Sequence, residues 1–185
     1  MASLGHVLVG LALARAHSRL SPGAQFEAGT PLRAVLAFPA LALLPDLDVI
    51  AFAFGIPYRD AFGHRGASHA ILTGLVVGAL AGVLIARLTR TPVVITALLA
   101  ALAMVSHGLL DTLTTGGEGA ALFWPFTDER YFAPFRPIPV APIGLGFLSM
   151  RGLYCAAVEL ALFSPFLAYA LLSRRARRTG TSARP

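Results

Sequence analysis

The stretch PVVITALLAALAMVSHGLLD, residues 92–111, joins a long apolar run to a histidine and an aspartate near its end. His107 is the only ionisable side chain between Pro92 and Leu110. A bilayer-spanning helix needs about 20 mostly apolar residues, so this run is long enough for one. On that helix His107 and Asp111 are four residues apart, which places them on one face, one turn from each other. The stretch therefore predicts a membrane helix with two metal-binding side chains at one end.

Other segments of the chain are similarly apolar. Residues 70–86 carry no charge, and residues 152–172 carry one charged side chain, Glu159. Of the 185 residues, 56% are hydrophobic and 13% are charged, whereas an ordinary soluble domain has about 25% charged residues. This composition argues against a soluble protein and makes the lipid bilayer the expected partner of most of the surface.

Residues 34–54 are long enough for a further span, but the sequence PDLD, residues 45–48, interrupts them. Proline removes a helical hydrogen-bond donor and disfavours helix at the preceding residue, so we expect a break at Pro45. Residues 4–14 are too short to span the bilayer unaided. The predicted fold is therefore an all-α, polytopic membrane helical bundle with about four transmembrane helices plus a short N-terminal helix. We expect one domain, residues 1–173, followed by a basic tail, residues 174–185.

All fifteen basic residues are arginine, and their distribution suggests an orientation. If the tail is cytoplasmic, the inner connections carry ten arginines and the outer connections carry five. Because arginine favours the cytoplasmic side, we expect a cytoplasmic tail, with the inverted topology as the alternative. The tail has no aromatic residues between its arginines, so we expect no nucleic-acid partner.

With this orientation, every candidate metal ligand falls on the outer side of the membrane. Charged groups in apolar segments are costly, and they usually mark function or pair with one another. Imidazoles with carboxylates suit a divalent metal, zinc first and manganese where oxygen ligands dominate. The candidate ligands are His6, Asp46, Asp48, His64, His69, His107 and Asp111.

Each of these signals also has a purely structural interpretation. The His107–Asp111 pair can be an intrahelical hydrogen bond, an aspartate of PDLD can cap the following helix, and HRGASH, residues 64–69, can be a polar surface loop.

Two residues are candidates for catalysis. Asp48 can act as a general base or as a hydrogen-bond partner of a histidine, and Arg65 can bind a phosphate or carboxylate oxygen.

Several other features lie outside the predicted ligand set. We expect Glu159 to hydrogen-bond within the bundle, His17 to be solvated among arginines, and Cys155 to lie in the core. The connection over residues 111–151 is rich in proline and aromatic residues and is longer than a passive connector usually is. It can cover the site at the membrane surface or serve only as an interfacial anchor, with Trp124 and Tyr131 at the headgroup level.

A set of motifs in a fixed order resembles a known family. GHVLVG (5–10), LLPDLD (43–48), GHRGASH (63–69), SHGLLDTLTTGG (106–117) and FWPF (123–126) together resemble the LexA-regulated metal-dependent hydrolases of the bacterial inner membrane. The resemblance implies a metal site at His64, His69, His107 and Asp111, with His6, Asp46 and Asp48 as further candidates. The order is also similar to that of zinc-dependent phospholipase C and the S1/P1 nucleases. Because no histidine follows Asp111, a third zinc is not expected here.

The leading hypothesis is a membrane-bound metal-dependent hydrolase of a lipid or another phosphoester. A metal- or proton-coupled transporter is the first alternative, for which only Glu159 has a suitable position within a span. The second alternative is a non-catalytic membrane protein whose metal joins helices. The substrate, the metal and the oligomeric state are left open by the sequence.

Overall fold

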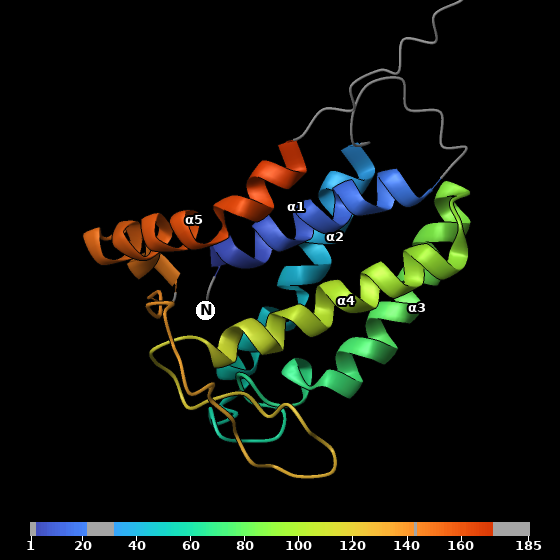
Figure 1. The fold of residues 1–185 in the computed structure, drawn as a ribbon. Helices are drawn as coiled ribbons and strands as arrows, with labels where there is room; N and C mark the ends of the chain where they lie inside the picture. Colours follow the sequence, from blue (N-terminus) through green and yellow to red (C-terminus); the bar gives the residue numbers. More distant parts are fainter. Residues whose placement is uncertain (1–2, 22–31, 143, 172–185) are drawn as a thin grey trace, which may run out of the picture.

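The computed structural model describes residues 3–21, 32–142 and 144–171. Five α-helices and three short 3-10 helices make up this part of the chain, and no β-strand occurs in it (Figure 1). The α-helices are α1 (Ser3–Leu20), α2 (Leu32–Leu43), α3 (Ile71–Thr89), α4 (Val93–Thr112) and α5 (Met150–Leu171); the 3-10 helices are η1 (Leu44–Phe54), η2 (Ala67–His69) and η3 (Gly144–Leu148).

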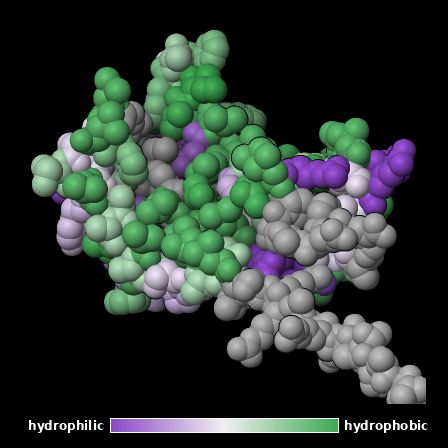
Figure 2. Space-filling view, turned by 90° about the horizontal axis from the view of Figure 1, so that it is seen from above, coloured by the Kyte–Doolittle hydropathy of each residue, from purple (hydrophilic) through white to green (hydrophobic). Residues whose placement is uncertain are grey.

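Four helical segments are long and apolar enough to cross a membrane. They are α2 continued by η1 (Leu32–Phe54), α3, α4 and α5. Most side chains in each of these spans face outward, because fewer than half of the residues in each are buried. Figure 2 shows one face of the molecule on which hydrophobic residues predominate. The all-helical fold with about four spans is therefore confirmed.

The second span changes geometry at the expected position. The α-helix ends at Leu43, and the chain continues as the 3-10 helix η1 with Pro45 in its first turn. Gly55, in the left-handed region with φ 73°, ends η1. The predicted break at Pro45 is thus confirmed, and it sets the direction of the two aspartates that follow.

The N-terminal helix differs from its prediction in length. α1 has 18 residues and lies between α2, α4 and α5 (Figure 1). Its first turn is held by Glu159 of α5, whose Oε2 accepts hydrogen bonds from the backbone N–H groups of Leu4 and Gly5, both at 2.8 Å. The expectation that Glu159 hydrogen-bonds within the bundle is confirmed. Its carboxylate, which the transporter hypothesis would use, joins α5 to α1 in the structure.

The expectation for His17 is wrong. Its side chain is buried, and Nε2 lies 2.9 Å from the Thr96 hydroxyl of α4. Because α1 continues to Leu20 inside the bundle, the imidazole packs against its neighbours instead of reaching water. Cys155 is buried, as expected.

α3 and α4 pack closely through small residues. A Cβ at Gly78 would lie 2.6 Å from the Cα of Ala101, and one at Gly82 would lie 2.5 Å from the Cα of Ala97. Small residues allow membrane helices to approach at backbone contact. This contact fixes α4, which carries two of the candidate ligands, against the segment that leads into α3.

Candidate metal centre

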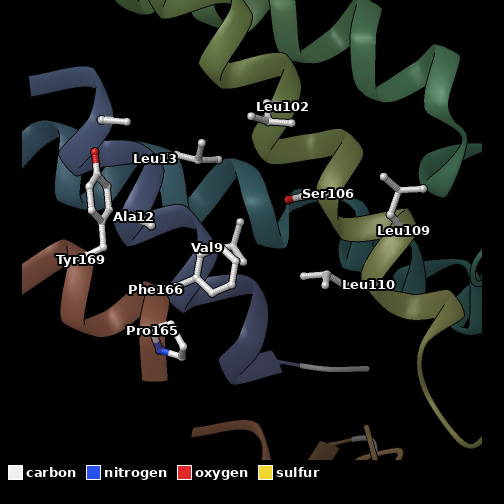
Figure 3. Close-up of a pocket in the computed structure, with 11 residues that line it drawn as sticks. Val9, Ala12, Leu13, Leu102, Ser106, Leu109, Leu110, Pro165, Phe166 and Tyr169 are labelled. Carbon is white, nitrogen blue, oxygen red and sulfur yellow. The ribbon is translucent and has the colours of Figure 1, made fainter. Parts of the chain in front are cut away.

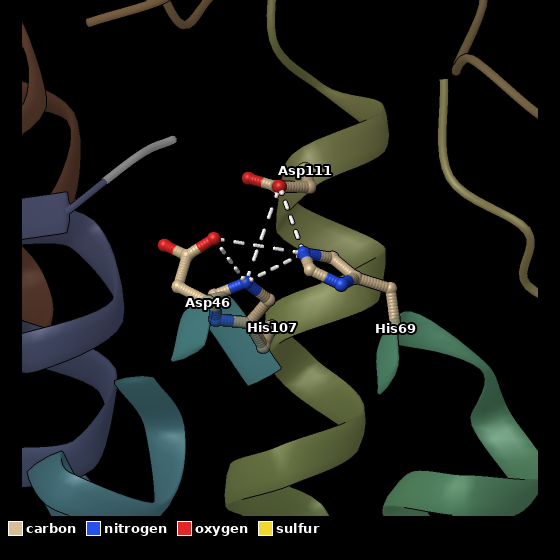
Figure 4. Close-up of side chains that lie close together, drawn as sticks. All are labelled: Asp46, His69, His107 and Asp111. Carbon is tan, nitrogen blue, oxygen red and sulfur yellow. Dashed lines mark hydrogen bonds and ion pairs between the residues drawn. The ribbon is translucent and has the colours of Figure 1, made fainter. Parts of the chain in front are cut away.

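Asp46, His69, His107 and Asp111 come together at one end of the bundle (Figure 4). η1 supplies the first, η2 the second and α4 the other two. One ligand atom from each lies within 4.8 Å of the others, and all four residues are buried. We call this group the Asp46–Asp111 cluster.

Two imidazole nitrogens form the middle of the cluster, with a carboxylate on either side. Nε2 of His69 and Nε2 of His107 are 3.0 Å apart. Asp46 Oδ1 lies 3.4 Å from His107 Nε2 and 3.7 Å from His69 Nε2. Asp111 Oδ2 lies 3.3 Å from His69 Nε2 and 3.9 Å from His107 Nε2.

The hydrogen-bond partners of the two Nδ1 atoms determine the tautomers of His69 and His107, and therefore whether their Nε2 atoms carry protons. His107 Nδ1 lies 2.7 Å from the carbonyl oxygen of Ala42, which can only accept, so Nδ1 carries the proton. His69 Nδ1 lies 3.2 Å from the Asp48 carboxylate, which favours the same tautomer. Two neutral rings would then face each other with lone pairs at 3.0 Å. That arrangement is unfavourable unless a proton or a cation lies between them.

The local charge also favours a cation. Burial opposes protonation of His69, but hydrogen bonds with Asp111, Asp46 and Asp48 outweigh it and raise the pKa of His69 to about 10. Without an ion, a proton on His69 and the guanidinium of Arg65 each offset one of the three negative charges of Asp46, Asp48 and Asp111; with His69 neutral, two negative charges would remain. A divalent cation would balance them.

The donor set fits zinc. Four donors arranged tetrahedrally at about 2.0 to 2.2 Å from an ion lie about 3.3 to 3.6 Å from one another, and the separations between histidine nitrogens and carboxylate oxygens here are 3.3 to 3.9 Å. All carboxylate oxygens of Asp46 and Asp111 are buried without a well-directed hydrogen bond from the described residues. Buried polar atoms normally have partners, so both Asp46 oxygens and Asp111 Oδ1 are available as ligands, whereas Asp111 Oδ2 is already ion-paired with Arg65 Nε at 2.8 Å.

His6 lies at the margin of the cluster. Its ring stacks on that of His107 at a centroid distance of 3.9 Å, and its Nε2 is 3.5 Å from Asp111 Oδ1. Both of its ring nitrogens are buried without a hydrogen-bond partner among the described residues. α1 thus brings a fifth donor side chain to the cluster.

Asp48 and His64 form a neighbouring group that shares His69. Asp48 accepts hydrogen bonds from His64 Nδ1 at 2.6 Å, from the Ser68 hydroxyl at 2.5 Å and from the backbone N–H of Arg65 at 3.0 Å. The two aspartates of PDLD therefore approach His69 from different sides, Asp46 at Nε2 and Asp48 at Nδ1. With so many donors around it, Asp48 is better placed to orient His69 and His64 than to take up a proton.

Arg65 is held by the protein over most of its guanidinium. Its Nε pairs with Asp111 Oδ2 at 2.8 Å, and its Nη1 donates to the Thr114 hydroxyl and the Gly116 carbonyl, both at 3.1 Å. Its backbone is in the left-handed region with φ 62°, directly before Gly66. Both Nε and Nη2 are buried without a well-directed hydrogen bond among the described residues, but Nε is ion-paired with Asp111, so Nη2 is the atom available to an anion.

The long connection after α4 covers this end of the bundle. The Ala121 N–H donates to the carbonyl of Arg65, and the Leu122 carbonyl accepts from the N–H of Ile71, both at 2.9 Å. Arg130 reaches the His64 carbonyl at 3.0 Å. Of the two alternatives for this connection, these contacts favour the covering role, and the exposed aromatic side chains Phe123, Phe126, Phe132 and Phe135 are also compatible with an interfacial anchor.

Some residues of the site were not recognised in the sequence. Ala42 supports His107 through a backbone carbonyl, which is free because the last carbonyls of an α-helix lack intrahelical donors. The Ser68 hydroxyl donates a hydrogen bond to Asp48, and α3 has no side-chain cap. Gly108 allows η2 to approach α4, since a Cβ there would lie 2.2 Å from the His69 carbonyl oxygen. Of these residues, only Gly108 is marked in the sequence, by its place within the HGLLD motif.

These features define a polytopic α-helical membrane protein with a buried histidine and aspartate cluster at one end of its bundle. The sequence model of the YdjM inner membrane protein family matches residues 1–179, so the chain belongs to that family. It is also similar to inner membrane protein YbcI of Escherichia coli (strain K12), with 43% identity over 115 residues. The match covers 62% of this chain and 66% of that protein, slightly less than two thirds of its length. No solved structure matches the chain.

We predict that the purified protein binds zinc and that His107→Ala and Asp46→Ala lose it. Each substitution removes a donor from the Asp46–Asp111 cluster and leaves the remaining set too small for tight binding. His17→Ala is the matched control, because His17 is also a buried histidine but lies near Thr96 instead. Elemental analysis after detergent purification is the measurement. Equal metal in wild type and His107→Ala would show that the ion binds elsewhere.

We predict that Asp48→Asn weakens zinc binding by about 10- to 100-fold, as removal of a carboxylate behind a histidine ligand generally does. The amide can still accept from Ser68, but it no longer favours the tautomer of His69 that presents Nε2 to the cluster. Asp60→Asn, at an exposed aspartate in the connection after η1, should have no effect. Competition with a chromophoric chelator gives the affinity, and an unchanged value for Asp48→Asn would exclude this role.

Proposed function

We propose that the protein is a membrane-bound metal-dependent hydrolase that cleaves an ester, with a phosphoester as the preferred class. The observation that carries the proposal is the convergence of the His69 and His107 nitrogens with the Asp46 and Asp111 oxygens. A buried set of this kind suits a divalent ion, zinc first and manganese second. The resemblance of the motifs to metal-dependent hydrolases supports the same reading.

The reaction requires water, a substrate and a place for a proton. In phosphoester hydrolysis the oxygen of water bonds to phosphorus, the bond from phosphorus to the alcohol oxygen breaks, and that oxygen takes up a proton. A divalent ion held by these residues would lower the pKa of its bound water, to about 7 in the best-known zinc enzymes, and would stabilise negative charge on the reacting oxygen.

The protein residues have separate parts in this scheme. Ala42 and Asp48 hold His107 and His69 in the orientation that points Nε2 into the cluster. Nη2 of Arg65 is the donor best placed to bind a phosphate oxygen, and its other nitrogens keep it next to Asp111. His6 offers a further nitrogen that can bind the ion or exchange a proton with the substrate.

One observation favours a second candidate, a structural metal. His107 and Asp111 are fully buried, and Asp46 is only 7% exposed. A closed site of four protein ligands is typical of zinc that stabilises a fold, whereas a catalytic site keeps one position open. In that case the ion would join η1, η2 and α4 without turning over a substrate.

We predict that the zinc-loaded protein hydrolyses a soluble phosphodiester such as bis(p-nitrophenyl) phosphate and that His107→Ala lowers the rate by at least about 100-fold. That loss corresponds to the several kcal/mol of stabilisation that a metal provides. Removal of the ion with a chelator should have the same effect, and zinc should restore activity. A zinc-loaded protein that hydrolyses neither phosphodiesters nor acyl esters but unfolds at lower temperature without its ion would support the structural candidate.

We also propose that the cluster lies at the outer face of the inner membrane, since the inner connections carry ten of the fifteen arginines. We predict that Asp128→Cys, in the exposed connection over the cluster, reacts with an impermeant maleimide in intact spheroplasts. Ser182→Cys, in the arginine tail, should react only after permeabilisation. The wild type is the control, because Cys155 is buried. The reverse labelling pattern would establish the inverted topology.

A further inference from the structure

An apolar groove lies between α1, α4 and α5 (Figure 3). Its volume is about 560 Å³, within the range of about 300 to 1,000 Å³ for ligand pockets. Leu13, Leu102, Leu110 and Phe166 are among the side chains that line it, and Ser106 and Tyr169 contribute the polar atoms. No part of the mechanism described above uses this groove.

Several residues that line the groove neighbour residues of the metal centre along α4 and α1. On α4, Ser106 and Leu110 line the groove, and each directly precedes a residue of the cluster, His107 and Asp111. α4 therefore presents the cluster and the groove on adjoining faces. On α1, Val9 follows His6 by three residues and lies on the same face, one turn further along.

From these residues the groove extends into the apolar part of the bundle. Along α4 the lining continues from Leu110 back to Leu102, a distance of about 12 Å at 1.5 Å per residue. Along α1 it continues to Ala16. The groove is therefore elongated, with apolar walls along its length, and its Leu110 end is the one next to Asp111 along α4.

The surroundings of the groove determine what can occupy it. α4 and α5 are two of the four membrane-spanning helices, so the medium next to the groove is lipid hydrocarbon. α5 bends partway along its length in Figure 1, and Pro165, which lines the groove, lies inside that helix. Proline kinks a helix because it removes a hydrogen bond and clashes with the preceding turn. An acyl chain is the occupant whose chemistry and shape match this site.

We propose that the substrate of the metal centre is a membrane lipid whose acyl chain lies in this groove, with its ester or phosphoester group at the Asp46–Asp111 cluster. This inference rests on the proposed hydrolase function and names its substrate class. A lipid phosphate at the cluster would meet Nη2 of Arg65, which is buried without a hydrogen-bond partner among the described residues. Hydrolysis would then proceed with the atom balance given above, releasing the part of the lipid beyond the cleaved bond.

The test uses the full-length protein in nanodiscs of phosphatidylethanolamine and phosphatidylglycerol. A phospholipid with a diazirine near the end of one acyl chain is photo-crosslinked, and the labelled residues are mapped by mass spectrometry. We expect labels at groove residues such as Leu13 and Leu102. Ala16→Trp, which fills the end of the groove away from the cluster, should remove most of this labelling without changing zinc content. Ala157→Trp, at an exposed alanine of α5 outside the groove, is the matched control.

Turnover provides the second measurement. We expect Ala16→Trp to lower the ratio of long-chain phospholipid hydrolysis to short-chain phosphodiester hydrolysis by about 10- to 100-fold, the range for a displaced substrate. Ala157→Trp should leave this ratio unchanged. An unchanged ratio in Ala16→Trp would overturn the proposal, as would the absence of groove labelling in the wild type.

The His107→Ala variant separates this proposal from the proposed function. It should lose zinc and hydrolysis but keep the groove labelling, because the acyl chain binds to other residues. Hydrolysis of soluble esters without groove labelling would leave the hydrolase standing and overturn the lipid substrate. Labelling without hydrolysis of any ester would overturn both, and would show that the groove holds a structural lipid.

Discussion

Two carboxylates buried among apolar helices are the constraint on which the rest of this structure depends. Asp46 and Asp111 are more than nine-tenths buried, and their oxygens lack well-directed hydrogen bonds from the described residues. Burial of an uncompensated charge is among the most costly events in folding. The neighbouring elements can be understood as means of compensation: Arg65 pairs with Asp111, histidines approach both carboxylates, and the remaining charge calls for a cation.

The sequence predicted the spans well because each depends on local composition. The apolar runs of α3, α4 and α5 and the break at Pro45 required no knowledge of tertiary contacts, and all of them are present. The pairing of His107 with Asp111 followed from helical spacing alone. The convergence of α4 with the PDLD and HRGASH motifs was predicted from topology, because the inferred orientation places all three on one side of the membrane.

Other features could not be read from the sequence because they depend on which neighbour a side chain meets. His17 lies among arginines in the chain but faces Thr96 in the bundle, so its surroundings were wrongly inferred. The different tasks of Asp46 and Asp48 arise from the 3-10 geometry of η1, in which residues two apart point in different directions. The support of His107 by Ala42 involves a backbone carbonyl, and every residue has one.

The distribution of the ligands along the chain has a consequence for biosynthesis. His6 leaves the ribosome early, whereas Asp111 follows more than a hundred residues later and at the end of α4. The centre therefore cannot exist during insertion of the first helices, and each free carboxylate must pass through that period protonated or exposed to water. An ion held by all four ligands is therefore acquired only after α4 has been inserted, and metal supplied before that point cannot fill the centre.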